Sequence, residues 1–194
     1  MRKVSLERKT GETTIAVDLC LDGQGKTEID TGVGFFDHML TLVGKHGFLD
    51  LTVKAQGDLQ VDAHHTVEDC GIVFGGAIRE ALADKEGINR YGNAFVPMDE
   101  SLAQVSIDLS GRPYLVFNAD FPKIALGNFD LELIEEFFQA VAVKADMTLH
   151  INLLYGSNTH HMAEAIFKAF ARALAQAVAK NEKIQGVLST KGVL

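Results

Sequence analysis

Apolar and polar residues alternate along the chain in patterns that predict a regular series of strands and helices. Strict alternation over residues 13–21 (TTIAVDLCL) is typical of a half-buried strand, because successive side chains of a strand point to opposite faces. Residues 64–83 instead repeat their apolar positions at the period of a helix. In the first half of the chain we expect strands over residues 13–21 and 26–30, a helix over 35–45, a strand over 48–53 and a helix over 64–83.

The second half repeats this order of elements. We expect a hairpin of two strands around Ser110-Gly111, then a helix, a strand and a long alanine-rich helix, over residues 102–109, 113–118, 131–145, 147–154 and 160–179. Both halves therefore give strand, strand, helix, strand, helix. We interpret the chain as an internal duplication of about 95 residues, with an α/β (α+β) fold in which halves 1–95 and 96–194 pack as one domain.

Three glycines interrupt the helix predicted over residues 64–83. Gly71, Gly75 and Gly76 each weaken a helix by roughly 1 kcal/mol relative to alanine. They are tolerable only where another part of the molecule packs closely against the helix, so we expect a close approach there.

The strongest chemical signal is a five-residue pattern that begins both long helices. His64-His65-Thr-Val-Glu68 in the first half recurs as His160-His161-Met-Ala-Glu164 in the second. Residues three and four apart lie on one face of a helix, so the glutamate can join either histidine of its own copy. Adjacent histidines point about 100° apart and cannot easily bind one ion together. Each HHxxE unit is therefore expected to contribute ligands to two separate metal ions.

Two further residues fall at corresponding places upstream of the two copies. His38 lies on the first predicted helix, and Glu136 lies on the helix that precedes the second copy. Together these residues predict two related sites with mixed imidazole and carboxylate ligands. Such ligands suit Mn, Fe, Co, Ni or Zn and do not choose among them. A histidine or glutamate at a helix start can also serve only as a capping or core residue, but its repetition in both halves favours metal ligation.

Composition and charge exclude several classes of protein. The chain has 194 residues, and its 18 Lys and Arg against 26 Asp and Glu give a net charge of −8, which opposes binding to a nucleic-acid backbone. No apolar run approaches the length of a membrane span, and no signal peptide is evident, so no membrane association is expected. Two cysteines, Cys20 and Cys70, are too few for a disulfide framework. These features favour a cytoplasmic protein.

Five segments carry a resemblance to a known enzyme family. They are GVGFFDHML (32–40), DAHHTVED (62–69), DLSGRPY (108–114), TLHI (148–151) and NTHH (158–161). The chain resembles imidazoleglycerol-phosphate dehydratase, a hydro-lyase of histidine biosynthesis, over essentially its whole length. The resemblance implies conversion of imidazole glycerol phosphate to imidazole acetol phosphate and water, two Mn²⁺ ions per subunit, and a 24-subunit assembly of trimers with active sites at subunit interfaces.

The resemblance also implies roles for individual residues. Many family members have a histidine where this chain has Glu136, which is a harder, anionic ligand. Metal-ligand positions are matched by His38, His64, His65, Glu68, Glu136, His160, His161 and Glu164. Substrate-binding positions are matched by Glu12, His38, His64, His65, Glu68, Arg90, Arg112, His160, Ser189 and Lys191. The residues alone favour a different interpretation, in which Arg90 and Arg112 are surface ion-pair residues and Glu12 is a solvated charge.

The implied mechanism starts from an imidazole ring that loses its N–H proton between two metal ions and expels the C3 hydroxyl, giving a diazafulvene-like intermediate. Glu12 would take the C2 proton, so Glu12 and the metal-binding His64 and His160 are the residues expected to be catalytic. Two other classes explain the duplicated histidines: a non-catalytic cage that binds transition metal, and a dinuclear metal hydrolase. The number of bound metal ions and the identity of the product distinguish them.

Overall fold

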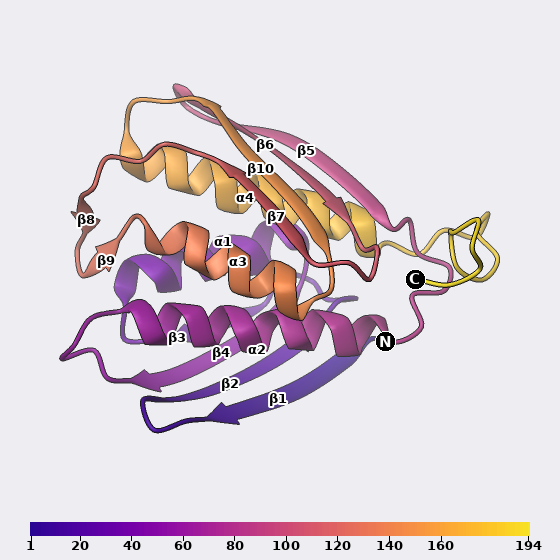
Figure 1. Ribbon diagram of the computed structural model, residues 1–194, viewed down its shortest axis with the longest axis horizontal. Coiled ribbons are helices and arrows are strands. Elements are labelled where there is room, and N and C mark those ends of the chain that lie inside the picture. Colours follow the sequence, from indigo (N-terminus) through magenta and orange to yellow (C-terminus); the bar gives the residue numbers. More distant parts are fainter.

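The computed structural model describes residues 1–194 and has two four-stranded sheets with four helices between them (Figure 1). In the first half the elements are β1 (Lys3–Lys9), β2 (Thr13–Cys20), β3 (Thr27–Asp30), α1 (Gly34–Gly47), β4 (Asp50–Gly57) and α2 (His64–Leu82). In the second half they are β5 (Tyr91–Met98), β6 (Ser101–Asp108), β7 (Tyr114–Asn118), β8 (Ala125–Leu126), β9 (Phe129–Asp130), α3 (Leu133–Lys144), β10 (Thr148–Tyr155) and α4 (Thr159–Val178). None of the helices is long and apolar enough to cross a membrane.

The two sheets have the same topology. Their strand orders are β1-β2-β4-β3 and β5-β6-β10-β7, and in each the last strand pairs in parallel while the others are antiparallel. The mixed α/β class is confirmed, and the matching orders agree with the predicted duplication. The predicted boundary between the two halves, at residues 95 and 96, lies inside β5. The structural repeat therefore begins with the loop before Tyr91.

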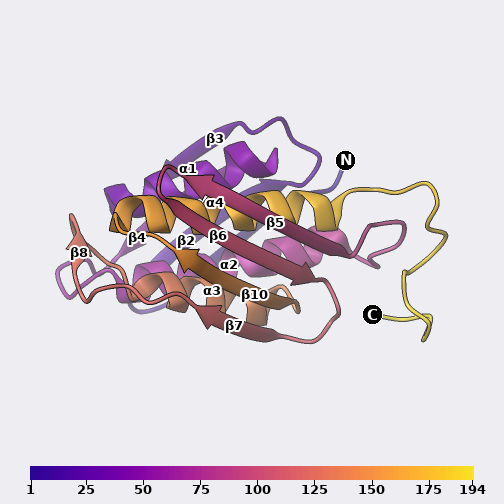
Figure 2. The ribbon, with the colours of Figure 1, turned by 90° about the horizontal axis from the view of Figure 1, so that it is seen from above.

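Helices from opposite halves pack on one another in the middle layer. α2 packs on α3 and α1 on α4, and Figure 2 shows α4 lying across β5 and β6. The aromatic core crosses the boundary between the halves: the Phe36 and Phe137 rings are 5.3 Å apart and those of Phe74 and Phe137 6.4 Å apart. A single apolar cluster of 48 buried residues therefore includes side chains of both halves.

Two strand pairings differ from the sequence-based expectation. Residues 26–30 do not pair with β2 as the second strand of a hairpin; they form β3, which pairs in parallel with β4. Residues 113–118 likewise do not form a hairpin with β6, because β7 pairs in parallel with β10. A turn signal shows where the chain reverses, but the partner of the next strand depends on which edge of the sheet the helices leave open.

The first strand of each half was not predicted. β1 is charged and mostly exposed, so its sequence KVSLERK resembles a solvated terminus. β5 carries exposed Tyr91 and Phe95 on its outer face, which hides the apolar–polar alternation of a half-buried strand. Both strands are edge strands, and each forms a hairpin with the strand that follows it.

The close approach expected at the α2 glycines is confirmed for two of the three. A Cβ at Gly71 would lie 2.8 Å from the carbonyl oxygen of Phe137, and one at Gly75 would lie 2.8 Å from that of Val141. Both oxygens belong to the backbone of α3, which therefore packs directly on the backbone of α2. At Gly76 the nearest atom is the Leu6 Cδ1 at 3.4 Å, which is a contact with a flexible side chain.

This difference predicts opposite effects of alanine at neighbouring positions. Gly71→Ala is expected to lower the free energy of unfolding by about 1–3 kcal/mol, because α3 must shift to admit the methyl group. Gly76→Ala should be neutral or raise it by up to about 1 kcal/mol through helix propensity. Denaturant unfolding of both variants tests this; equal stability of the two would contradict the packing of α3 on α2.

Candidate metal centre

The HHxxE units sit at the amino-terminal ends of α2 and α4, as predicted, and both ends lie on the same side of the molecule (Figure 1). Short polar side chains fix these helix starts. The Asn158 Oδ1 accepts hydrogen bonds from the backbone N–H groups of His160 and His161 at 3.0 and 3.3 Å, and the Asp62 Oδ1 accepts one from His64 N at 2.7 Å. Asn158 is the N-cap of α4, whereas Asp62 lies one residue before the N-cap of α2, Ala63; in both helices the two histidines lie on the first turn.

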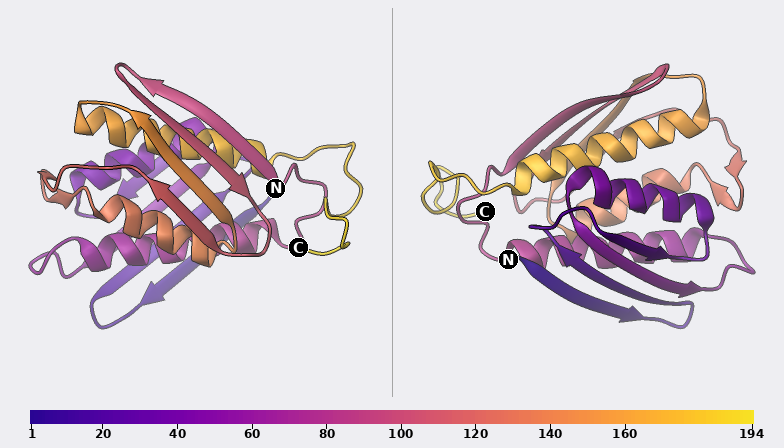
Figure 3. Two further views of the ribbon diagram at one scale, coloured as in Figure 1. Left: turned by 45° about the horizontal axis from the view of Figure 1, so that its top comes forward. Right: turned by 180° about the vertical axis from the view of Figure 1, so that it is seen from behind.

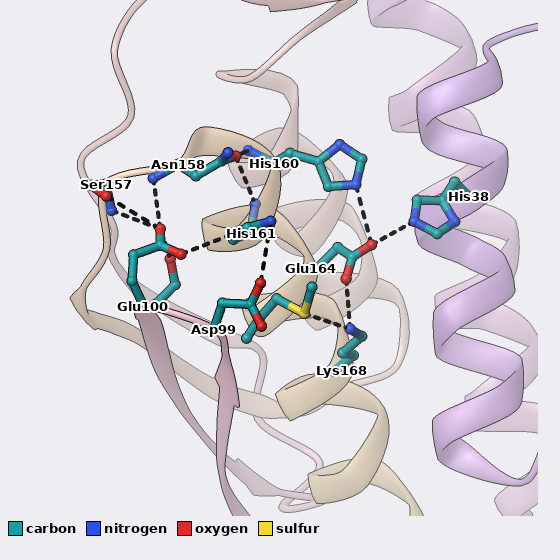
Figure 4. Close-up of polar contacts among 11 residues, drawn as sticks. His38, Asp99, Glu100, Ser157, Asn158, His160, His161, Glu164 and Lys168 are labelled. Carbon is teal, nitrogen blue, oxygen red and sulfur yellow. Dashed lines mark hydrogen bonds and ion pairs between the residues drawn. The ribbon is translucent and has the colours of Figure 1, made fainter.

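One cluster of metal-ligating side chains is assembled between α1 and α4. The Glu164 Oε1 lies 2.7 Å from the His38 Nε2 and 3.2 Å from the His160 Nε2. Figure 4 shows the two imidazole rings on either side of this carboxylate. His160 and Glu164 are one helical turn apart on α4, whereas His38 comes from the other half of the chain. The three ligand atoms lie within 4.8 Å of one another.

Lys168 holds the carboxylate of this cluster from its other side. The Lys168 Nζ lies 2.6 Å from the Glu164 Oε2, one helical turn further along α4. Burial alone would raise the pKa of Glu164, but hydrogen bonds from Lys168 and His38 outweigh that effect and lower it to about 2. Glu164 is thus an anionic oxygen ligand at neutral pH. Lys168 had no signal in the sequence beyond its position four residues after Glu164.

This donor set fits a divalent transition metal. Two imidazole nitrogens and one carboxylate oxygen converge, with no thiolate, and this mixture suits Mn, Fe, Co, Ni or Zn. The histidine side chains are 43% and 45% exposed, so ligands from outside can reach the same point. The Glu164 side chain is only 9% exposed, so the anionic ligand of the cluster is held in a fixed position.

The corresponding residues of the other helix pair are not gathered in the same way. Glu136 on α3 and His64 and Glu68 on α2 occupy positions equivalent to the cluster just described, and α3 packs on α2 as α1 packs on α4. Glu136 is exposed, and no three donor atoms converge there. Two carboxylates replace the histidine–carboxylate pair at these positions, and like charges do not hold each other together without a cation.

The second histidine of each unit points away from the first. The His160 and His161 rings are 6.4 Å apart at 85°, and those of His64 and His65 are 6.2 Å apart at 78°. The His65 Nδ1 lies 3.0 Å from the Asp58 Oδ2 and 3.7 Å from the Glu12 Oε2. The second histidines therefore belong to different surroundings from the first, as helix geometry requires.

The residues matched to phosphate binding lie at the opposite end of α4. The backbone N–H of Arg90 donates to the carbonyl of Ala177 at 2.9 Å, in the last turn of this helix. His160 in the first turn is about 25 Å away at 1.5 Å per residue. Figure 3 shows the carboxy-terminal segment, which contains Ser189 and Lys191, extending beyond this same end.

The two arginines differ in how closely other groups of the chain hold them. The Arg90 guanidinium donates to both oxygens of Asp108, at 2.7 and 3.1 Å, and to the Leu188 carbonyl at 2.7 Å. The Arg112 side chain is 66% exposed and lies 4.0 Å from the Asp108 Oδ2. The Ser189 Oγ accepts a hydrogen bond from the Lys191 backbone N–H at 3.2 Å. Within one chain both arginines thus pair with Asp108, and Arg112, whose contacts are longer, is the more exposed of the two.

Comparison with known proteins identifies the family. The family model for imidazoleglycerol-phosphate dehydratase matches residues 31–174. The chain is 62% identical over 193 residues to the imidazoleglycerol-phosphate dehydratase of Acetivibrio thermocellus, covering 100% of this chain and 99% of that protein. The enzyme of Streptococcus mutans is 60% identical over 194 residues, with 100% of both chains covered.

The chain belongs to the imidazoleglycerol-phosphate dehydratase family. Its fold agrees with solved members: the Staphylococcus aureus enzyme has a TM-score of 0.84 at 47% identity and covers 92% of this chain and 99% of its own. The Pyrococcus furiosus enzyme has a TM-score of 0.84 at 40% identity, covering 97% and 100%. The chain is therefore a hydro-lyase of histidine biosynthesis, as the resemblance predicted.

Proposed function

We propose that the chain dehydrates imidazole glycerol phosphate to imidazole acetol phosphate with two Mn²⁺ ions bound per subunit. The observation that carries this proposal is the convergence of His38, His160 and Glu164 from two halves of the chain onto one point. A dehydratase must stabilise a poor hydroxide leaving group and remove a weakly acidic proton, and an imidazole-plus-carboxylate metal centre is suited to both tasks.

Two sets of side chains would hold the ions. The first set is the assembled cluster, and the second consists of the equivalent residues His64, Glu68 and Glu136, with His65 and His161 as further ligands. When bound, the metal would act as a Lewis acid that favours loss of the imidazole N–H proton and departure of the C3 hydroxyl. Glu164, ionised and held by Lys168, provides the negative charge that attracts a divalent cation.

Glu12 is the proposed general base. It lies in the turn between β1 and β2, its side chain is 57% exposed, and its Oε2 is 3.7 Å from the His65 Nδ1. It is thus next to a proposed metal ligand but not bonded into the cluster, and it can accept a proton from C2 of a bound substrate. The proton and the C3 hydroxyl leave as water, and the enol product tautomerises to the ketone.

The substrate phosphate would be bound by a different copy of the chain. An extended imidazole glycerol phosphate is about 10 Å long at bond lengths near 1.5 Å, whereas His160 and Arg90 lie at opposite ends of α4, about 25 Å apart. One subunit therefore cannot place both groups on one substrate. A homo-oligomer in which Arg112, Ser189 and Lys191 of one copy face the histidines of another solves this problem, and the 24-subunit assembly expected from the family is our proposal for it.

The proposal includes a cytoplasmic location. Cys20 and Cys70 are both buried and unpaired. Burial raises the pKa of the Cys70 thiol strongly, so it acts as a small core side chain and not as a reactive thiolate. Free cysteines of this kind fit a reducing compartment.

Metal removal and replacement test the proposed function. Protein treated with a chelator is expected to lose all dehydratase activity, and reloading with Mn²⁺ should restore formation of imidazole acetol phosphate, with close to two ions per subunit by elemental analysis. Many more ions per subunit and no product would favour the metal-binding cage instead. Release of inorganic phosphate or another hydrolysis product would favour the hydrolase.

A further inference from the structure

The second histidine of α4 is held by a carboxylate that comes from a different element. The Glu100 Oε2 lies 2.7 Å from the His161 Nδ1, and Glu100 stands in the turn between β5 and β6 (Figure 4). Its other oxygen, Oε1, accepts hydrogen bonds from the backbone N–H groups of Asn158 and Ser157, at 2.7 and 3.1 Å. Glu100 therefore ties the β5–β6 turn to the start of α4 and fixes the orientation of one imidazole ring.

The second histidine of α2 is held in the same way from an unrelated position. Asp58 lies just after β4, and its two carboxylate oxygens are 3.0 and 3.2 Å from the His65 Nδ1. An ionised carboxylate can only accept hydrogen bonds, so the imidazole in each pair carries its proton on Nδ1. In both halves this leaves Nε2 of the second histidine as the nitrogen with a free lone pair.

The two halves use carboxylates from different positions to hold the second histidine. Glu12 and Glu100 are equivalent in the duplication, because each is the last residue of a hairpin turn, directly before Thr13 of β2 or Ser101 of β6. In the second half Glu100 holds the histidine. In the first half Asp58 holds His65, and the Glu12 Oε2 stays 3.7 Å from that nitrogen, outside hydrogen-bond distance.

We propose that Glu100 and Asp58 are positioning residues, which fix the Nδ1–H tautomer and ring orientation of His161 and His65 and so keep Nε2 of each ring as the nitrogen that would bind a metal ion. The proposal rests on the metal sites of the proposed function. It also explains why only one of the two equivalent glutamates serves as a base: Asp58 frees Glu12 for the substrate, whereas every oxygen of Glu100 is occupied. A carboxylate that holds a ligating histidine in this manner typically contributes 10–100-fold to metal affinity.

Glu100→Gln tests this with little change in shape. The glutamine carbonyl can still accept from the α4 backbone, but its NH₂ would donate toward His161 Nδ1 and favour the tautomer with the proton on Nε2. We expect Mn²⁺ affinity, measured by calorimetry on the intact assembly, to fall about 10–100-fold. In metal-free protein with ¹⁵N-labelled histidine, the His161 nitrogens should change from the Nδ1–H to the Nε2–H pattern. If Glu100 only stabilised the fold, the substitution would not change the tautomer of His161.

Matched variants keep the test decisive. Glu7→Gln removes an exposed carboxylate on β1, away from both second histidines, and should leave Mn²⁺ affinity unchanged. The Asp58 carboxylate makes hydrogen bonds only to His65. Asp58→Asn therefore repeats the test without disturbing the start of a helix, if Glu100→Gln does not fold. Wild-type affinity and an unchanged tautomer in the folded variants would overturn the inference. A protein that binds Mn²⁺ but forms no product would overturn only the proposed function, since the affinity ratio would still be measurable.

Discussion

Replacing Glu12 by glutamine is expected to lower kcat at least about a hundredfold while leaving the bound metal unchanged. The reason is its place in the structure: the Glu12 carboxylate lies 3.7 Å from His65, outside hydrogen-bond distance, so it can act as a base without a hydrogen bond to the histidines. Glutamine has nearly the same shape and cannot take a proton. Steady-state kinetics with imidazole glycerol phosphate, together with elemental analysis of the same sample, measure both quantities.

The control for this variant is Glu7→Gln, because Glu7 lies on β1 in the same hairpin and is exposed. Its turnover should equal that of the wild type. If Glu12→Gln retains near-normal turnover, Glu12 is not the base. If it loses metal together with activity, Glu12 acts as a ligand instead.

Two inactive variants are expected to restore activity when they are assembled together. Glu164→Gln removes the anionic ligand of the metal cluster, and Arg112→Ala removes the exposed arginine proposed to bind phosphate. Each homogeneous assembly should be almost inactive. Because the two groups lie toward opposite ends of α4, a site in a mixed assembly can take its metal cluster from the Arg112→Ala chain and its arginine from the Glu164→Gln chain. Random mixing of equal amounts should restore up to about a quarter of wild-type activity.

The experiment dissociates the two variants, mixes them and reassembles them before assay. Each variant taken through the same procedure alone is the first control, and a mixture of Arg112→Ala with the doubly substituted chain is the second. Neither control can form a complete site. Failure of the mixed assembly to gain activity, with subunit exchange demonstrated by mass spectrometry, would place the metal ligands and the phosphate-binding arginine of a site in the same subunit.

The sequence predicted those helices and strands that bury one face and expose the other. The helices α2 and α4 and the strands β2, β6 and β10 each present one apolar and one polar face, so their periodicity identified them. β1 and β5 lacked that contrast and were missed. The strand partners of β3 and β7 were also wrong, since pairing across a sheet depends on contacts that no local pattern encodes.

For the site, the sequence by itself determined which side chains share a helix face. The spacing of His160, Glu164 and Lys168 places them on one side of α4 whatever surrounds the helix. The duplication likewise indicated that His38 and Glu136 hold equivalent positions. Local geometry of this kind survives in any fold that keeps the helix intact.

Only the tertiary structure decided which faces meet. It brings His38 to Glu164 across 126 residues of chain, gives His161 its carboxylate from the β5–β6 turn, and sends Arg90 to the far end of α4. These contacts arise because burying the apolar faces of four helices between two sheets fixes how the helices pack. A sequence period records that a face is apolar, but it does not record which other face will cover it.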